Sequence, residues 1–145
     1  MDLIPSVAVL IIKDGKVLLV KHTEEAGHLT DTYGLPSGRI KENETEKQAA
    51  IREFFEETGL KSSEKNLIEF EGNYHIAEIE RKGGGIVKFG WRVFLCKDYF
   101  GEIKMSPETI PEWIEIKNLD SYNLLSNTKN VALAGLKYLQ NEAKS

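Results

Sequence analysis

Three glutamates lie close together between Ala49 and Gly59, at positions Glu53, Glu56 and Glu57. On an α-helix with about 100° between successive residues, Glu57 lies at about 40° and Glu56 at about −60° from Glu53. The three carboxylates would then share one narrow helix face. Carboxylate oxygens bind hard divalent cations such as Mg²⁺, and a metal held in this way can activate water and polarise a phosphate. This spacing therefore favours metal-dependent phosphate chemistry.

The alternative for the same residues is a solvated acidic helix face, the usual explanation of a Glu-rich helix taken alone. Like charges four residues apart destabilise an isolated helix by about 0.2–0.5 kcal/mol per pair, so Glu53 and Glu57 together need compensation. A bound divalent cation would supply it. Arg52 also has two interpretations, as part of a site or as a surface partner of Glu56 or Gln48.

Signals at both ends predict a helix over residues 46–58. Thr45 followed by Gln48 is a capping-box pattern, and Gly59 followed by Leu60 is typical of a helix C-cap. The helix start and stop are thus specified locally.

The opposite side of this helix is expected to face the protein core. Ile51, Phe54 and Phe55 lie at about 100–200° from Glu53 on the same wheel. The loop that ends at Ser37-Gly38 is the expected neighbour of the acidic face.

The rest of the chain alternates between strand-like and helix-like segments. Apolar runs at Val7–Ile12 and Val17–Val20, around the turn signal Asp14-Gly15, predict a buried β-hairpin. The other expected elements are a loop over 22–37, β-rich segments over 67–81 and 86–96 around three glycines, a short strand over 113–116 and a helix over 129–140. This order predicts an α/β (α+β) fold with a mixed β-sheet packed between helices.

Composition and length indicate one globular domain over residues 1–145. Hydrophobic residues make up 41% and charged residues 29% of the 145 residues, which excludes a disordered or fibrous chain. The longest apolar run, Val7–Ile12, is too short to span a bilayer, and no signal peptide precedes it, so we expect a cytoplasmic protein without membrane contact. Cys96 is the only cysteine and lies in an apolar run, so we expect a buried thiol.

The charge distribution argues against nucleic-acid partners. The net charge is −4, and the Lys and Arg residues are scattered rather than gathered in a stripe. An acidic protein can still bind a small phosphorylated ligand when divalent cations lie between its carboxylates and the phosphates.

Residues 38–60 read GRIKENETEKQAAIREFFEETGL. The pattern is Gly, five residues, Glu, seven residues, then Arg-Glu-hydrophobic-any-Glu-Glu-any-Gly-hydrophobic. This stretch resembles the Nudix box, the signature of the Nudix (MutT-like) hydrolases, and its spacing is complete. Seven fixed identities give a chance match on the order of 10⁻⁸ per starting position. Phe54 is a mild departure, because the family more often has an aliphatic residue there.

The resemblance implies an αβα sandwich and a metal-dependent pyrophosphohydrolase. It implies that Glu56 and Glu57 are metal ligands, that Glu53 is a ligand or the base that activates water, and that the Gly38 carbonyl completes the coordination. Mg²⁺ is the expected metal, with Mn²⁺ as a substitute. Glu108, in a later loop, is the expected further catalytic carboxylate.

Other residues of the motif have supporting roles in the resemblance. Glu44 and Arg52 would brace the site, and the predicted catalytic set includes Arg52. Arg39 would reach a substrate phosphate, and Gly59 would be a structural helix stop. Glu112 is the alternative to Glu108, and either residue can instead be a solvated loop carboxylate.

The substrate is predicted only as a class. Tyr33 is a candidate to stack on a base, whereas Phe89 and Trp91 share one strand face, where core packing is favoured. No clean match to the markers of ADP-ribose, dinucleoside polyphosphate or NADH hydrolases occurs around 75–77, so a nucleoside triphosphate or modified nucleotide is the default. Hydrolysis of ADP-ribose or a dinucleoside polyphosphate, and a non-catalytic nucleotide sensor, are the alternatives. A homodimer is left open.

Overall fold

The computed structural model describes residues 3–144 and contains two sheets and two main helices. The strands are β1 (Leu3–Leu10), β2 (Ile12–Lys13), β3 (Lys16–His22), β4 (Tyr33–Gly34), β5 (Ser37–Arg39), β6 (Leu67–Ile68), β7 (Tyr74–Glu80), β8 (Ile86–Cys96) and β9 (Thr109–Glu115). The helices are α1 (Glu46–Thr58) and α2 (Thr128–Ala143), with short 3₁₀ helices at Glu64–Asn66 and Ile116–Ser121.

The first sheet is mixed and the second is antiparallel. In the first, β1 lies between β5, which is antiparallel to it, and β8, which is parallel; β6 and β7 pair with β8. In the second, β3 pairs with β2, β4 and β9. The two central strands, β1 and β3, therefore belong to different sheets.

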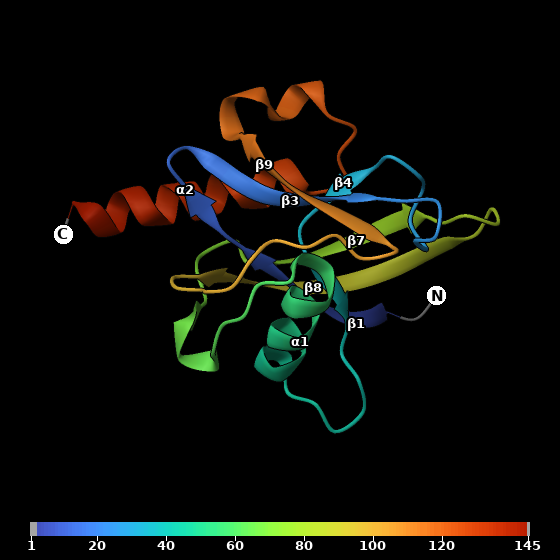
Figure 1. Cartoon of the computed structure of the whole chain (residues 1–145), viewed down its shortest axis with the longest axis horizontal. Coiled ribbons are helices and arrows are strands. Elements are labelled where there is room, and N and C mark those ends of the chain that lie inside the picture. The colour runs from blue at the N-terminus through green and yellow to red at the C-terminus, as the bar shows by residue number, and fades with distance from the viewer. Residues whose placement is uncertain (1–2, 145) are drawn as a thin grey trace.

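The two helices cover opposite sides of these sheets (Figure 1). Side chains on β1 alternate between the two faces. Val7 and Val9 belong to a buried cluster with Phe54 of α1, whereas Ala8 and Leu10 belong to a cluster that includes Val131 of α2. This αβα arrangement confirms the predicted fold class.

Helix α1 has the predicted ends but not all of the predicted faces. The capping box of Thr45 and Gln48 is present, and Gly59 ends the helix with φ 83°. Phe54 is fully buried, but Phe55 is 49% exposed, so its predicted core position is wrong. The buried stripe runs through Ala50, Phe54 and Thr58, four residues apart, and Phe55 lies about 100° beyond it.

The predicted hairpin between Val7–Ile12 and Val17–Val20 is wrong in its pairing. Only the short β2 pairs with β3 at the turn, while β1 passes into the other sheet and pairs with β8 over eight residues. Both apolar runs are buried because each forms the centre of a different sheet.

The remaining predicted elements are present with shifted ends. The helix predicted over 129–140 lies within α2, the strand over 113–116 overlaps β9, and β7 and β8 form a hairpin around the three glycines. Cys96 is buried, as predicted. Across residues 3–144, no helix has the length and apolar character needed to cross a membrane.

Candidate active site

Four carboxylates line a hollow between α1 and the loop before β9. Glu53, Glu56 and Glu57 come from α1, and Glu108 comes from the loop; together with Ser106 and Pro107 they line a space of about 260 Å³. A neighbouring cavity of about 190 Å³ is lined by Glu53, Glu57 and Glu108 and extends away from the helix. The helical spacing and the loop thus bring oxygen ligands from two distant segments to one place.

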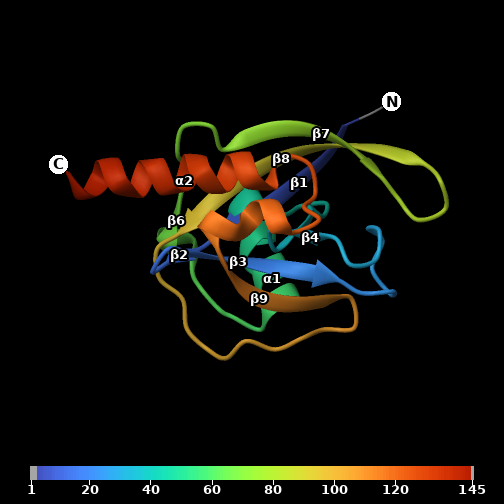
Figure 2. The same cartoon turned by 90° about the horizontal axis from the view of Figure 1, so that it is seen from above.

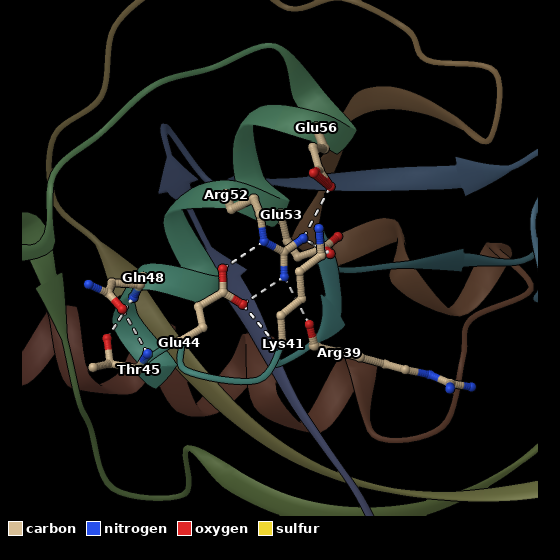
Figure 3. Close-up of polar contacts among 8 residues, drawn as sticks. All are labelled: Arg39, Lys41, Glu44, Thr45, Gln48, Arg52, Glu53 and Glu56. Carbon is tan, nitrogen blue, oxygen red and sulfur yellow. Dashed lines mark hydrogen bonds and ion pairs between the residues drawn. The ribbon is translucent and has the colours of Figure 1, made fainter.

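Arg52 is the hub of the polar contacts on α1 (Figure 3). Its Nε and Nη2 donate to the two carboxylate oxygens of Glu44 at 2.7 and 2.9 Å. Its Nη1 donates to Glu53 at 2.6 Å and to Glu56 at 3.2 Å, and Nη2 also donates to the Arg39 carbonyl at 3.0 Å. The paired guanidinium holds the pKa of Glu44 down to about 2. Glu44 and Arg52 therefore fix the loop before α1 to the acidic face.

Replacement of Arg52 by Lys should disconnect this hub, because an ammonium group cannot reproduce the planar fork that contacts several acceptors. We expect kcat/KM to fall about 10–100-fold and the free energy of unfolding to fall by about 1–3 kcal/mol. Steady-state kinetics and urea unfolding measure the two effects.

Arg92→Lys is the matched control, because Arg92, in β8, also pairs with two carboxylates, those of Glu46 and Glu69. Its kinetics should match those of the wild type. An Arg52→Lys protein with unchanged kcat/KM would show that the hub does not organise the site.

The backbone of β5 lies directly against the acidic face, as predicted for Ser37-Gly38. The N–H of Ser37 donates to Glu57 at 2.7 Å. A Cβ at Gly38 would overlap the carboxylate of Glu53, which would then have to move from its present position. The backbone of β5 is therefore in direct contact with two of the carboxylates.

The carboxylate cluster concentrates negative charge in a poorly solvated place. Burial raises the pKa of Glu57 well above its ordinary value; the N–H of Ser37 opposes the shift, and Glu53 and Glu108 add to it. Burial likewise raises the pKa of Glu53, against the opposing effect of Arg52. A cation bound among these groups would relieve both effects.

The donor set fits a hard divalent cation, although it is not fully assembled. Within residues 3–144, no three Asp, Glu, His or Cys side chains already converge as a complete metal site. The reason is visible in the contacts, because Arg52 holds Glu53 and Glu56 while Ser37 holds Glu57. Glu56 is 49% exposed and accepts one hydrogen bond, from Arg52, so a cation can recruit its carboxylate by competing with that bond.

The structure separates the two loop candidates. Glu108 lines both hollows beside α1. Glu112, in β9, lies beside Tyr33, where burial and the neighbouring Glu112 raise the pKa of the Tyr33 phenol to about 12. The Thr109 hydroxyl, next to Glu108, donates to the Glu57 carbonyl at 3.0 Å and ties this loop to α1.

Tyr33 does not lie where a stacking residue was predicted. Its ring packs edge-on against Tyr122 at 5.1 Å and contacts the core cluster on the α2 side. It is not among the described residues that line the cavity beside Glu57. The pairing of Tyr33 with Lys21 in the second sheet fixes the position of Tyr33 there.

A family model described as the NUDIX domain matches residues 2–129 of the chain. The chain belongs to the Nudix family. Residues 38–60, whose spacing resembles the Nudix box, lie within the matched stretch. Nudix hydrolases generally use divalent metal ions such as Mg²⁺, which agrees with the oxygen-rich donor set on α1.

Individual Nudix relatives differ in their named substrates. The chain is 32% identical over 118 residues to the ADP-ribose pyrophosphatase of Methanocaldococcus jannaschii, a match covering 79% of this chain and 64% of that protein. Thus the match spans somewhat less than two thirds of that relative's length.

Solved Nudix structures share the fold at lower identity. The MutT protein of Methanosarcina mazei Go1 is 24% identical with a TM-score of 0.72, covering 98% of this chain and 96% of that one. The NUDIX domain of Shewanella oneidensis NrtR, complexed with ADP ribose, is 15% identical with a TM-score of 0.71, covering 96% and 90%.

Several cavity residues of this Nudix domain carry no local sequence signal. His22, His28 and Arg81 line the cavity with Arg39, and the stacked rings of Phe89 and Trp91 line it as well. Phe89 and Trp91 are nearly fully buried, as predicted for core residues, yet they also contribute to the cavity wall. Arg81 precedes a glycine-rich turn and looks like an ordinary hairpin residue in the sequence.

Proposed function

We propose that this Nudix protein is a Mg²⁺-dependent pyrophosphohydrolase that cleaves a diphosphate linkage in a nucleotide-like small molecule. The observation that carries the proposal is the hollow bounded by Glu53, Glu56, Glu57 and Glu108. Four carboxylates around one space are costly without a cation, and a cation there faces an open polar cavity.

Different residues of the site would bind the metal, position its ligands and bind the substrate phosphate. Glu53, Glu56 and Glu57, with the Gly38 carbonyl, would hold the metal, which when bound polarises phosphate oxygens and neutralises charge on the leaving group. Arg52 keeps Glu53 in place, and Arg39 binds a phosphate.

One carboxylate of the cluster, Glu53 or Glu108, removes a proton from water as the water oxygen bonds to phosphorus. The bridging phosphorus–oxygen bond breaks at the same centre, and the leaving phosphate departs with its electron pair. No covalent enzyme intermediate is needed.

A nucleoside triphosphate or modified nucleotide is the first candidate substrate. The second candidate is ADP-ribose, which is favoured by the 32% identity to an ADP-ribose pyrophosphatase. A binding-only sensor is the candidate from another class, but the Nudix box retains Arg52 and all three helix glutamates, which a pure binding module does not need.

A hydrolysis panel tests the proposal. We expect turnover of at least one compound among nucleoside triphosphates, oxidised nucleotides, ADP-ribose and dinucleoside polyphosphates in Mg²⁺, and none in EDTA. Reaction in ¹⁸O-labelled water identifies the attacked phosphorus. Metal-dependent binding without turnover would support the sensor, and neither binding nor turnover across the panel would contradict the proposal.

A further inference from the structure

Two arginine side chains line the cavity and have no ion-pair partner among residues 3–144. Arg39 and Arg81 both line it, and across residues 3–144 neither side chain forms an ion pair or a hydrogen bond. The backbone carbonyl of Arg39 accepts a hydrogen bond from Arg52, and Figure 3 shows the Arg39 guanidinium directed away from that hub. Unpaired arginines in a partly enclosed polar space indicate a site for an anion.

The position of Arg81 is built by several independent contacts. Its guanidinium lies over the Phe89 ring, 5.6 Å from the centroid. Gly27 faces the same group, and a Cβ there would overlap it, so the loop backbone at Gly27 lies directly against this guanidinium. The backbone of His28 bridges to that of Arg81. Arg81 is therefore held in the cavity wall and is not a free surface residue.

The hairpin tip and the loop of residues 23–32 lie side by side in both views (Figures 1 and 2). Lys82 joins them by donating to the carbonyls of Thr23 and Glu24 at 3.2 and 2.6 Å. This contact carries Arg81 from the far end of the β7–β8 hairpin to a cavity whose other wall is α1. The Nδ1 atom of His28, in the same wall, is buried without a hydrogen-bond partner in the described chain.

The wall of the cavity thus carries negative charge on one side and positive charge on another. Glu53, Glu57 and Glu108 lie on one wall, and Arg39 and Arg81 supply positive charge from other segments. Burial lowers the pKa of Arg81, repulsion between the Arg81 and Arg39 guanidiniums lowers it further, and the Glu108 carboxylate opposes the shift. An anion between them would remove that repulsion.

We propose that Arg81, together with Arg39, binds a terminal phosphate group of the substrate and makes this site selective for nucleotides that end in a free phosphate. A terminal phosphate carries about −1.5 to −2 charges at pH 7, enough to engage both guanidiniums. The uncharged sugar at the end of ADP-ribose offers neither charge nor the bidentate geometry. The inference rests on the proposed function, and within that function it favours nucleoside triphosphates as the class of substrate.

The test measures binding of two probes, inorganic triphosphate and ADP-ribose, by calorimetry with Ca²⁺ in place of Mg²⁺. We expect Arg81→Ala to weaken triphosphate binding about 10–100-fold and ADP-ribose binding less than about threefold. Arg81→Lys should fall between, because Lys keeps the charge and loses the fork. Arg81→Met, which keeps an apolar stem over Phe89, should match Arg81→Ala and guards against a loss due to misfolding.

Lys88→Ala is the matched control, because Lys88 lies on the same hairpin but on the face of β8 opposite Phe89. It removes the same charge and should leave both affinities within about twofold. Equal weakening of both probes by Arg81→Ala, or no binding of triphosphate by the wild type, would overturn the inference.

The failure of the two proposals can be told apart. Arg81-dependent triphosphate binding without turnover of any panel compound would support the Arg81 assignment and contradict the proposed hydrolysis. Hydrolysis of ADP-ribose that is unaffected by Arg81→Ala, with triphosphate bound no better than ADP-ribose, would support the proposed hydrolysis and contradict the Arg81 assignment.

Discussion

Glu57→Gln is expected to lower the Mg²⁺-dependent hydrolysis rate about 10³-fold, because a metal ligand contributes several kcal/mol of transition-state stabilisation and each 1.36 kcal/mol is tenfold in rate. Glutamine keeps an oxygen that can accept the hydrogen bond from Ser37, so the geometry of α1 should persist. It also removes one charge from a poorly solvated cluster. We therefore expect a melting temperature in the absence of metal at or above that of the wild type.

Initial rates on the best panel substrate, with metal-dependent shifts in melting temperature, measure this prediction. Glu46→Gln is the control, because Glu46 lies in the first turn of the same helix and pairs with Arg92. It should retain activity within about twofold of the wild type. A Glu57→Gln protein with normal rate and normal Mg²⁺ response would remove the basis for assigning the metal to this face.

Phe54→Ala is expected to lower the free energy of unfolding by about 3–5 kcal/mol, the usual result of truncating a fully buried aromatic side chain. Phe54 is inaccessible to solvent and packs in the cluster that joins α1 to Leu18 of β3 and Phe94 of β8. A cavity there would loosen α1 from both sheets. Urea unfolding followed by circular dichroism gives the difference.

Phe55→Ala provides the paired comparison within one helix turn. Phe55 is 49% exposed, and the Nζ atom of Lys61 lies over its ring, 5.5 Å from the centroid. Its truncation should cost less than about 1 kcal/mol. Equal losses for the two variants would mean that α1 turns both rings toward the core.

Local interactions explain why the helix and its acidic face follow from the sequence. Capping at Thr45 and Gly59 depends on residues within one turn of each end. The angular grouping of Glu53, Glu56 and Glu57 depends only on the helical repeat. Such features are decided by neighbours in the chain, so they can be read without knowing the rest of the molecule.

Strand pairing could not be read in the same way. The Asp14-Gly15 turn correctly indicated a reversal, but nothing local shows that β1 leaves its neighbour and pairs with β8, about 80 residues later in the chain. The same limit applies to Phe55, because the helical repeat gives the angles between residues and only packing decides which angle faces the core.

The sequence by itself determined the family and the carboxylate helix, because these depend on short-range spacing within residues 38–60, and the order of strand-like and helix-like segments along the chain indicated the fold class. Tertiary structure alone decided that Glu108 rather than Glu112 joins the helix carboxylates, that Tyr33 packs against Tyr122, and that Arg81 reaches the cavity. These outcomes depend on strand register and on two loops meeting in space. The physical reason is that long-range contacts between segments, which have no local signature, set those positions.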